Sequence, residues 1–145
     1  MKIIPHGAAR EVTGSCHEIQ VNGKKILLDC GLFQGHRQES AVKNAEFPFN
    51  PAEIDAMVLS HAHADHVGRV PLLSKKGFNA PIHCTYATKD LAAVMLADSA
   101  YINTKDEEYF CKYLAKSMMQ CDGPLYTIED AEECLTHFEG ENYNE

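Results

Sequence analysis

His61-Ala62-His63-Ala64-Asp65-His66 is the most informative segment of this 145-residue chain. It holds four side chains that can ligate a metal ion, and it follows the apolar run 56–59, which is typical of a buried strand. Zinc at catalytic sites takes imidazole nitrogen and carboxylate oxygen and keeps one position open for water. The segment therefore predicts a metal site in a loop at the end of a strand.

The spacing of these four side chains separates them into two pairs. On extended backbone, His61 and His63 point the same way, because side chains alternate with a period of two. Asp65 keeps that period and His66 breaks it. We therefore expect one loop to serve two metal ions, with His61 and His63 on the first and Asp65 and His66 on the second. The alternative is a His-rich, solvated loop without metal.

Length and composition are those of one globular domain. The chain is 45% hydrophobic and 23% charged, and it contains no tryptophan. No run approaches the ~20 apolar residues of a transmembrane helix. The apolar run at the N-terminus, Ile3-Ile4-Pro5, is too short for a signal peptide. We therefore expect a cytoplasmic location and no membrane partner.

Charge and cysteine usage narrow the function classes. The net charge is −8, of which residues 1–97 contribute +1 and residues 98–145 contribute −9. The acidic C-terminal third argues against non-specific nucleic-acid binding through bulk charge, but a bound metal ion supplies local positive charge, so a nuclease is not excluded. The six cysteines form no C-x-x-C pair, which argues against a thiolate zinc site. We expect reduced, mostly buried thiols.

The rest of the chain indicates early strands followed by strand–helix alternation. Asn22-Gly23 predicts a type I′ hairpin between strands at 16–21 and 24–29. Three further strands are expected, at 2–4, 56–59 and 81–84. Helices are expected from Pro71 to just before Gly77, over 88–103, over 107–119 and after a capping box at Thr127, whereas loops are expected over 36–55 and 61–68. No strand is expected near the C-terminus. This order favours a layered α/β or α+β sandwich.

Several segments together resemble the metallo-β-lactamase fold and, within it, the β-CASP branch of RNA-processing nucleases. The similarity is carried by Gly7-Ala8-Ala9-Arg10-Glu11-Val12-Thr13-Gly14-Ser15, by Leu28-Asp29-Cys30-Gly31, by Phe33-Gln34-Gly35 and by Ser60 to Pro71. That branch includes the mRNA 3′-end cleavage factor of the cleavage and polyadenylation machinery. The resemblance covers essentially the whole chain and is loose after about residue 100. It implies an α+β fold that forms the N-terminal part of an αβ/βα sandwich.

The resemblance also implies roles for individual residues. His61 and His63 match ligands of a first zinc ion, and Asp65 and His66 match ligands of a second. Asp65 further matches the residue that orients and deprotonates the attacking water, so it is the candidate catalytic residue. Asp29 matches an acidic residue at a strand end that supports the metal ligands from outside the coordination sphere. A turn-forming role is the alternative for Asp29. The substrate-binding residues are not identified.

Only part of the family pattern is present in residues 1–145. The remaining ligands of the family are a His in a His-x-x-Gly-Ser-like segment, a bridging Asp and a further His, and the chain has no such segment. His137 is expected at a helix end and not on a metal. We therefore expect a truncated N-terminal part of a metallo-β-lactamase domain, without the β-CASP insertion and the C-terminal half. Self-association or a complementary chain would complete it.

By resemblance, the expected activity is zinc-dependent phosphodiester hydrolysis of RNA. One alternative is a catalytically silent metal-binding fragment or interaction module. The other is a hydrolase of the same fold that acts on another substrate class, since this fold also hydrolyses thioesters and lactams. A catalytic zinc takes three protein ligands, and this chain offers two for each ion. We therefore expect weak zinc binding and little turnover from residues 1–145 alone.

Overall fold

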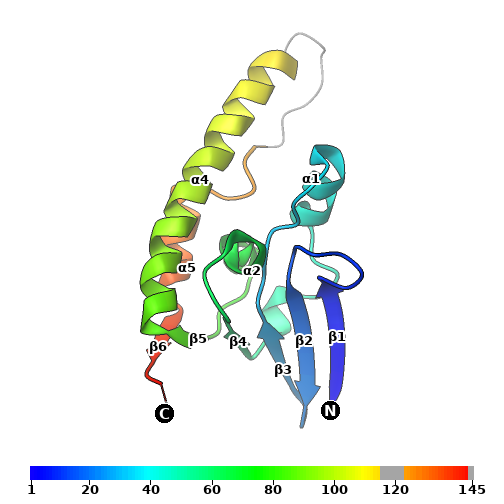
Figure 1. Cartoon of the computed structure of the whole chain (residues 1–145), viewed down its shortest axis with the longest axis vertical. Coiled ribbons are helices and arrows are strands. Elements are labelled where there is room, and N and C mark those ends of the chain that lie inside the picture. The colour runs from blue at the N-terminus through cyan, green and yellow to red at the C-terminus, as the bar shows by residue number, and fades with distance from the viewer. Residues whose placement is uncertain (115–122, 144–145) are drawn as a thin grey trace.

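A six-stranded mixed sheet forms the centre of the structure, a computed structural model that describes residues 1–114 and 123–143 (Figure 1). The strands lie side by side in chain order. They are β1 Lys2–Gly7, β2 Cys16–Val21, β3 Lys24–Leu28, β4 Ala56–Val58, β5 Ile82–Thr85 and β6 Phe138–Glu141. The first three strands pair antiparallel and the pairs from β3 to β6 are parallel. Together with the helices this gives an α+β fold, as expected.

The helices are of very different lengths. They are α1 Arg37–Ala45, α2 Ala64–Val67, α3 Val70–Lys75, α4 Tyr86–Leu114 and α5 Ile128–Leu135, with a short 3-10 helix at Pro51–Glu53. The predicted capping box of α5 is confirmed, because the Thr127 side chain accepts from the Asp130 N–H while the Asp130 carboxylate accepts from the Thr127 N–H. Among the described helices, none is long and apolar enough to cross a membrane.

The β2–β3 hairpin turns where the sequence predicts it. Asn22 and Gly23 have φ values of 50° and 77°, the left-handed conformation that a type I′ turn requires. Val21 pairs with Lys24 across this two-residue turn. The turn fixes the register of β2 against β3, and therefore the face on which each side chain lies.

The two faces of the sheet differ in burial. On one face, Leu27, Met57, Ile82 and Phe138 sit opposite one another on neighbouring strands and are buried in the core. On the other face, the side chain of Val58 is 43% exposed. The helices therefore cover one face of the sheet more completely than the other.

Three sequence-based expectations about helices and strands outside residues 61–68 are wrong. The two helices expected at 88–103 and 107–119 form one continuous helix, α4, through residue 114, while residues 115–119 lie outside the described part. Helix α1 lies within the region expected to be irregular, where the Asn44 side chain bonds to both the N–H and the carbonyl of Phe33. Strand β6 was not expected, and it forms because Phe138 is buried beside Ile82. The last two elements depend on contacts between distant parts of the chain, which local patterns do not show.

The cysteines follow the expectation in part. Cys16, Cys30, Cys84 and Cys134 are free and buried. Burial raises the pKa of the Cys30 thiol well above its usual value, which keeps it protonated and unreactive. Cys111 is disulfide-bonded, contrary to the expectation, and Cys121 lies outside the described residues.

A buried arginine ties the loop after β3 to helices α1 and α3. Arg69 is 1% exposed, and its guanidinium donates to the carbonyls of Gly31 at 2.7 Å, Lys43 at 3.1 Å and Glu46 at 3.4 Å. It also lies between the rings of Phe33 and Phe47, 4.8 Å from each ring centroid. Backbone carbonyls and aromatic faces therefore surround this charge.

We expect Arg69→Met to lower the free energy of unfolding by about 2–4 kcal/mol, because the buried Gly31 carbonyl and the partly buried carbonyls of Lys43 and Glu46 lose a charged donor. Urea unfolding followed by circular dichroism measures this value. Lys2→Met, at an exposed position, is the control and should change stability by less than about 0.5 kcal/mol. A loss in Arg69→Met no larger than in this control would contradict the role given to Arg69.

Candidate metal centre

The candidate ligands lie at the carboxyl ends of two adjacent parallel strands. Asp29 directly follows β3, and His61 comes three residues after the end of β4. The two ends are held together by a hydrogen bond from the Asp29 N–H to the Val58 carbonyl, 3.0 Å long. Ligand sites of open α/β sheets form at this edge, because the loops that leave parallel strands meet there.

The expectation of a loop over residues 61–68 is wrong in part. Residues Ala64–Val67 form the single-turn helix α2. His63 is its N-cap, so the backbone is extended up to His63 and helical after it. This change of direction returns His66 to the neighbourhood of His61, whose ring centroid lies 4.0 Å away. All three imidazoles therefore gather at one place.

Two pairs of possible ligand atoms lie close together among the four residues His61, His63, Asp65 and His66. His61 Nε2 and His63 Nδ1 are 3.2 Å apart, and His66 Nε2 and Asp65 Oδ2 are 3.6 Å apart. Two ligands of a tetrahedral zinc ion, each at about 2.0–2.1 Å from the metal, are separated by ~3.3 Å. Each pair therefore fits two corners of a zinc coordination sphere.

Asp29 holds His66 in place from beneath the site. It is 3% exposed, and its Oδ2 accepts from His66 Nδ1 at 2.8 Å, Ser60 Oγ at 2.9 Å and Ser15 Oγ at 3.2 Å. Its Oδ1 accepts from the Ser60 N–H at 2.8 Å. Because His66 Nδ1 carries the proton in this bond, Nε2 keeps the lone pair that a metal requires. Asp29 also has a φ of 60°, so it is a turn residue as well.

Ser60 orients His61, a role that the sequence analysis did not assign. Since the Ser60 hydroxyl proton goes to Asp29, the 2.9 Å contact with His61 is a bond donated by His61 Nδ1. This leaves His61 Nε2 unprotonated and facing His63. Burial, followed by the neighbouring charges of His66 and His63, lowers the pKa of His61, which favours the neutral imidazole that ligates metals.

The loops around the site are locked together by backbone contacts. The Asp65 carbonyl accepts from the Ser15 N–H at 2.8 Å, and the His66 carbonyl accepts from the Cys30 N–H at 2.8 Å. A Cβ on Gly31 would collide with the Asp65 carbonyl, so only glycine permits this close approach. The segments that the sequence analysis singled out separately therefore form one unit.

A third group of donors lies on β5 and β6. His83 Nδ1 is 3.0 Å from Glu141 Oε1 and 3.7 Å from Glu139 Oε2. Within residues 1–114 and 123–143, this is the one set of three metal-ligating side chains whose donor atoms all lie within 4.8 Å of one another. This group could not be predicted from the sequence, because its members come from strands more than 50 residues apart. The carboxylates are exposed, and exposed acidic groups are common without a metal.

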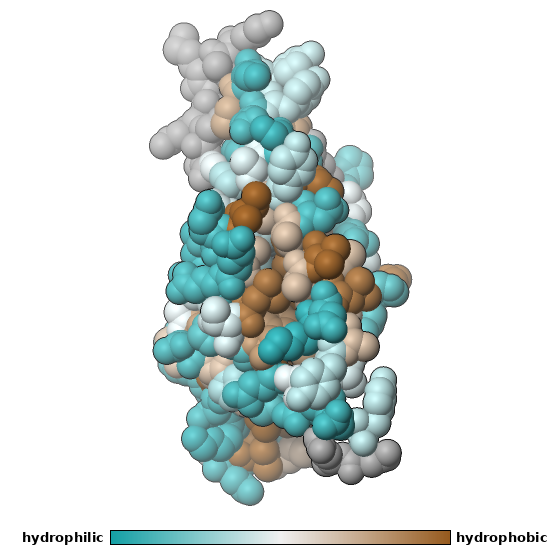
Figure 2. All heavy atoms as spheres, turned by 90° about the vertical axis from the view of Figure 1, so that its left-hand side faces the viewer, coloured by the Kyte–Doolittle hydropathy of each residue, from teal (hydrophilic) through white to brown (hydrophobic). Residues whose placement is uncertain are grey.

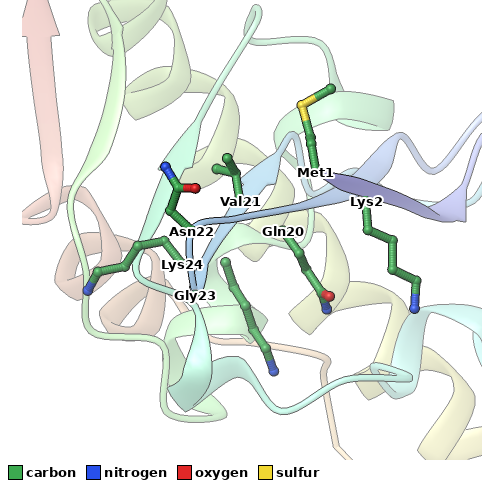
Figure 3. Close-up of a pocket in the computed structure, with 8 residues that line it drawn as sticks. Met1, Lys2, Gln20, Val21, Asn22, Gly23 and Lys24 are labelled. Atoms are coloured by element: carbon green, nitrogen blue, oxygen red, sulfur yellow. The ribbon is translucent and has the colours of Figure 1, made fainter.

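One cavity lies away from this site. A cavity of about 380 Å³ lies at the β2–β3 turn, lined by Met1, Lys2 and residues 20–25 (Figure 3). Two of its lysines are neutralised, since Lys24 pairs with Asp55 at 2.6 Å and Lys25 pairs with Glu53. These two ion pairs therefore cancel part of the positive charge around the cavity.

Comparison with known proteins identifies the family. Residues 9–100 match the model described as the metallo-beta-lactamase superfamily. The chain belongs to this superfamily, which implies that it binds divalent metal ions. The expected resemblance is therefore confirmed.

Similar curated proteins are named for functions in RNA processing and transcription. The chain is 43% identical over 145 residues to ribonuclease TTHA0252 of Thermus thermophilus, covering all of this chain and 29% of that protein. It is 35% identical over 116 residues to transcription termination factor FttA of Methanococcus maripaludis, which corresponds to 79% of this chain and 18% of that protein. It is 33% identical over 146 residues to cleavage and polyadenylation specificity factor 73 of Drosophila melanogaster, covering all of this chain and 19% of that protein. The chain spans less than a third of the length of these relatives.

We expect Asp29→Asn to weaken zinc binding about 10- to 100-fold, because His66 would lose the carboxylate that orients it. Competition with a colorimetric zinc chelator measures the dissociation constant. Asp55→Asn is the matched control, since Asp55 accepts hydrogen bonds from Lys24 and from the Lys25 N–H at the surface. Equal zinc affinity in the Asp29 and Asp55 variants would argue against the supporting role of Asp29.

Proposed function

We propose that this chain carries the metal-binding part of a zinc-dependent hydrolase that cleaves RNA phosphodiesters. The observation behind the proposal is the arrangement of two ligand pairs around one buried carboxylate. His61 with His63 and Asp65 with His66 have the separations that zinc ligands require, and Asp29 orients His66. The names of the relatives favour RNA as the substrate.

The residues of this chain have distinct roles in the proposed reaction. His61 and His63 would hold one zinc ion, and Asp65 and His66 would hold the second. When bound, such ions supply Lewis-acid activation of water and stabilise charge on the phosphate. The Asp65 side chain is partly exposed, so it can orient a water molecule and accept its proton. Ser60 keeps the His61 ring in its ligating orientation.

The charge of the chain places a constraint on RNA binding. The net charge of residues 1–145 is −8, so this chain repels a polyanion. Within the proposal, the metal ions provide the local positive charge that attracts the phosphate. RNA binding should therefore depend on metal.

The two alternative functions differ from the proposal in what they require. A silent metal-binding or interaction module would bind zinc without cleaving RNA at any protein concentration. A hydrolase of another substrate class would cleave a thioester or lactam and leave RNA intact, and a panel of substrates separates these cases. The assignment of residues 1–145 as the N-terminal part of one domain and the cytoplasmic location stay predictions.

We expect residues 1–145 to bind zinc weakly and to cleave RNA slowly or not at all, because each proposed ion has two ligands instead of three. Zinc per chain is measured by atomic emission after dialysis, and cleavage with a labelled RNA oligonucleotide. The double variant His61→Ala/His63→Ala should lose the zinc that the wild type retains, whereas His83→Ala should keep it. Zinc loss in His83→Ala alone would move the metal site to β5 and β6. Fast, EDTA-sensitive cleavage would contradict the expected weak activity.

We also propose that two copies of the chain associate through the exposed face of α4. Figure 2 shows hydrophobic side chains gathered on this side of the molecule. Val94, Tyr101 and Ile102 are all exposed, with Val94 at 67%, and helical spacing places them on one face. Asp98 and Lys105 lie on the same face. They are equally far along the helix from the midpoint between Tyr101 and Ile102. An antiparallel pair of α4 helices would therefore set each Asp98 opposite Lys105 of the second copy.

We expect Asp98→Lys to weaken self-association and Asp98→Lys/Lys105→Asp to restore it, because the double exchange recreates opposite charges across the pair. Sedimentation velocity over a range of protein concentrations measures the dimer fraction. Glu39→Lys, at an exposed position on α1, is the control for a change of charge alone, because it alters the net charge by the same amount and sign. A wild-type chain that stays monomeric at high concentration would contradict the proposal.

A further inference from the structure

A cavity of about 330 Å³ lies directly beside the candidate metal ligands. It is lined by His61 and His63, by residues in the first turns of α4, and by Tyr143, which follows the end of β6. The volume is near the lower end of the ~300–1,000 Å³ range of small-molecule sites. It therefore suits one small group of a substrate held at the metal ligands.

The lining has the chemistry of a site for a flat, uncharged group. Apart from the two histidines, every side chain that lines the cavity is uncharged. Ala87 and Leu91 give an apolar surface, and Tyr143 is 81% exposed, so its ring is free to be covered. An anion would have no cationic side chain here, whereas an aromatic heterocycle could stack on the tyrosine ring.

Two threonines add a polar edge to the cavity. Thr85 Oγ1 donates to Thr88 Oγ1 at 3.0 Å and accepts from the Thr88 N–H at 3.2 Å. The proton of the Thr88 hydroxyl is not used in either bond, so it can be donated to an acceptor on a ligand. An apolar wall, an aromatic ring and one fixed hydroxyl donor together match a nucleobase.

We infer that this cavity binds the base of the nucleotide next to the phosphate that the metal site would cleave, with Tyr143 as the stacking surface. The inference rests on the proposed function, because it takes RNA as the substrate. It adds a base-binding position for which Tyr143, Leu91 and Thr88 are responsible. Tyr143 is a positioning residue, since the ring would contact the base and not the reacting phosphate.

The test is a titration of the ¹⁵N-labelled chain with uridine and adenosine 5′-monophosphates, followed by NMR without added metal. We expect amide shifts at Ala87, Thr88, Leu91 and Tyr143. Tyr143→Ala should weaken binding by about 5- to 100-fold, the range seen when a stacking aromatic is removed. Tyr143→Phe should bind within about twofold of the wild type, because the ring is retained. Ribose 5-phosphate, which has no base, should bind much more weakly than either nucleotide.

Tyr113→Ala is the matched control, because Tyr113 is also an exposed tyrosine but lies near the far end of α4. Unchanged nucleotide affinity in Tyr143→Ala, or equal binding of ribose 5-phosphate and the nucleotides, would overturn the inference. Failure of the proposed function is seen in a separate measurement, as a His61→Ala/His63→Ala variant that retains as much zinc as the wild type. The nucleotide titration needs no metal and no turnover, so the two failures are distinguishable.

Discussion

The buried carboxylate of Asp29 is the group on which the arrangement of the site depends. An ionised carboxylate away from water has to be paired and hydrogen-bonded, or its burial costs several kcal/mol, about what an unpaired buried ion costs in proteins. Asp29 meets this need with donors from three segments: Ser15 before β2, Ser60 after β4 and His66 in α2. The hydrogen bonds to this one carboxylate therefore hold three segments together. The positions of the histidines follow from these bonds.

The sheet makes this convergence possible. Because β3 and β4 are parallel, both strands end at the same edge, and Asp29 and Ser60 emerge there within hydrogen-bonding distance. The glycine at position 31 lets the loop after β3 come close to residues 61–66, the motif loop. Ser15 and Cys30 can therefore donate hydrogen bonds to carbonyls of the motif loop. The Arg69 side chain also ties the loop after β3 to α1. The site is thus supported by backbone hydrogen bonds and by the hydrogen bonds of the Arg69 guanidinium.

Features specified by a few neighbouring residues could be predicted from the sequence. The Asn22-Gly23 turn and the Thr127 capping box follow from local conformational preferences, and the closeness of His61 to His63 follows from the side-chain period on extended backbone. The partners of Asp29 were not predictable in the same way, since Ser60 and Ser15 reach it only after the sheet has formed. The group of His83, Glu139 and Glu141 was missed for the same reason, because strand pairing creates it. Helix α2 was missed because four residues carry too short a pattern to distinguish one helical turn from a loop.

We propose that the chain binds metal at the motif loop, which Asp29 orients. Diffraction from zinc-loaded crystals, recorded at the zinc absorption edge, is the decisive test, because the anomalous signal locates each zinc ion independently of the protein atoms. We expect one peak bounded by His61 and His63 and a second bounded by Asp65 and His66. A zinc peak at His83, Glu139 and Glu141, with none in the motif loop, would contradict it.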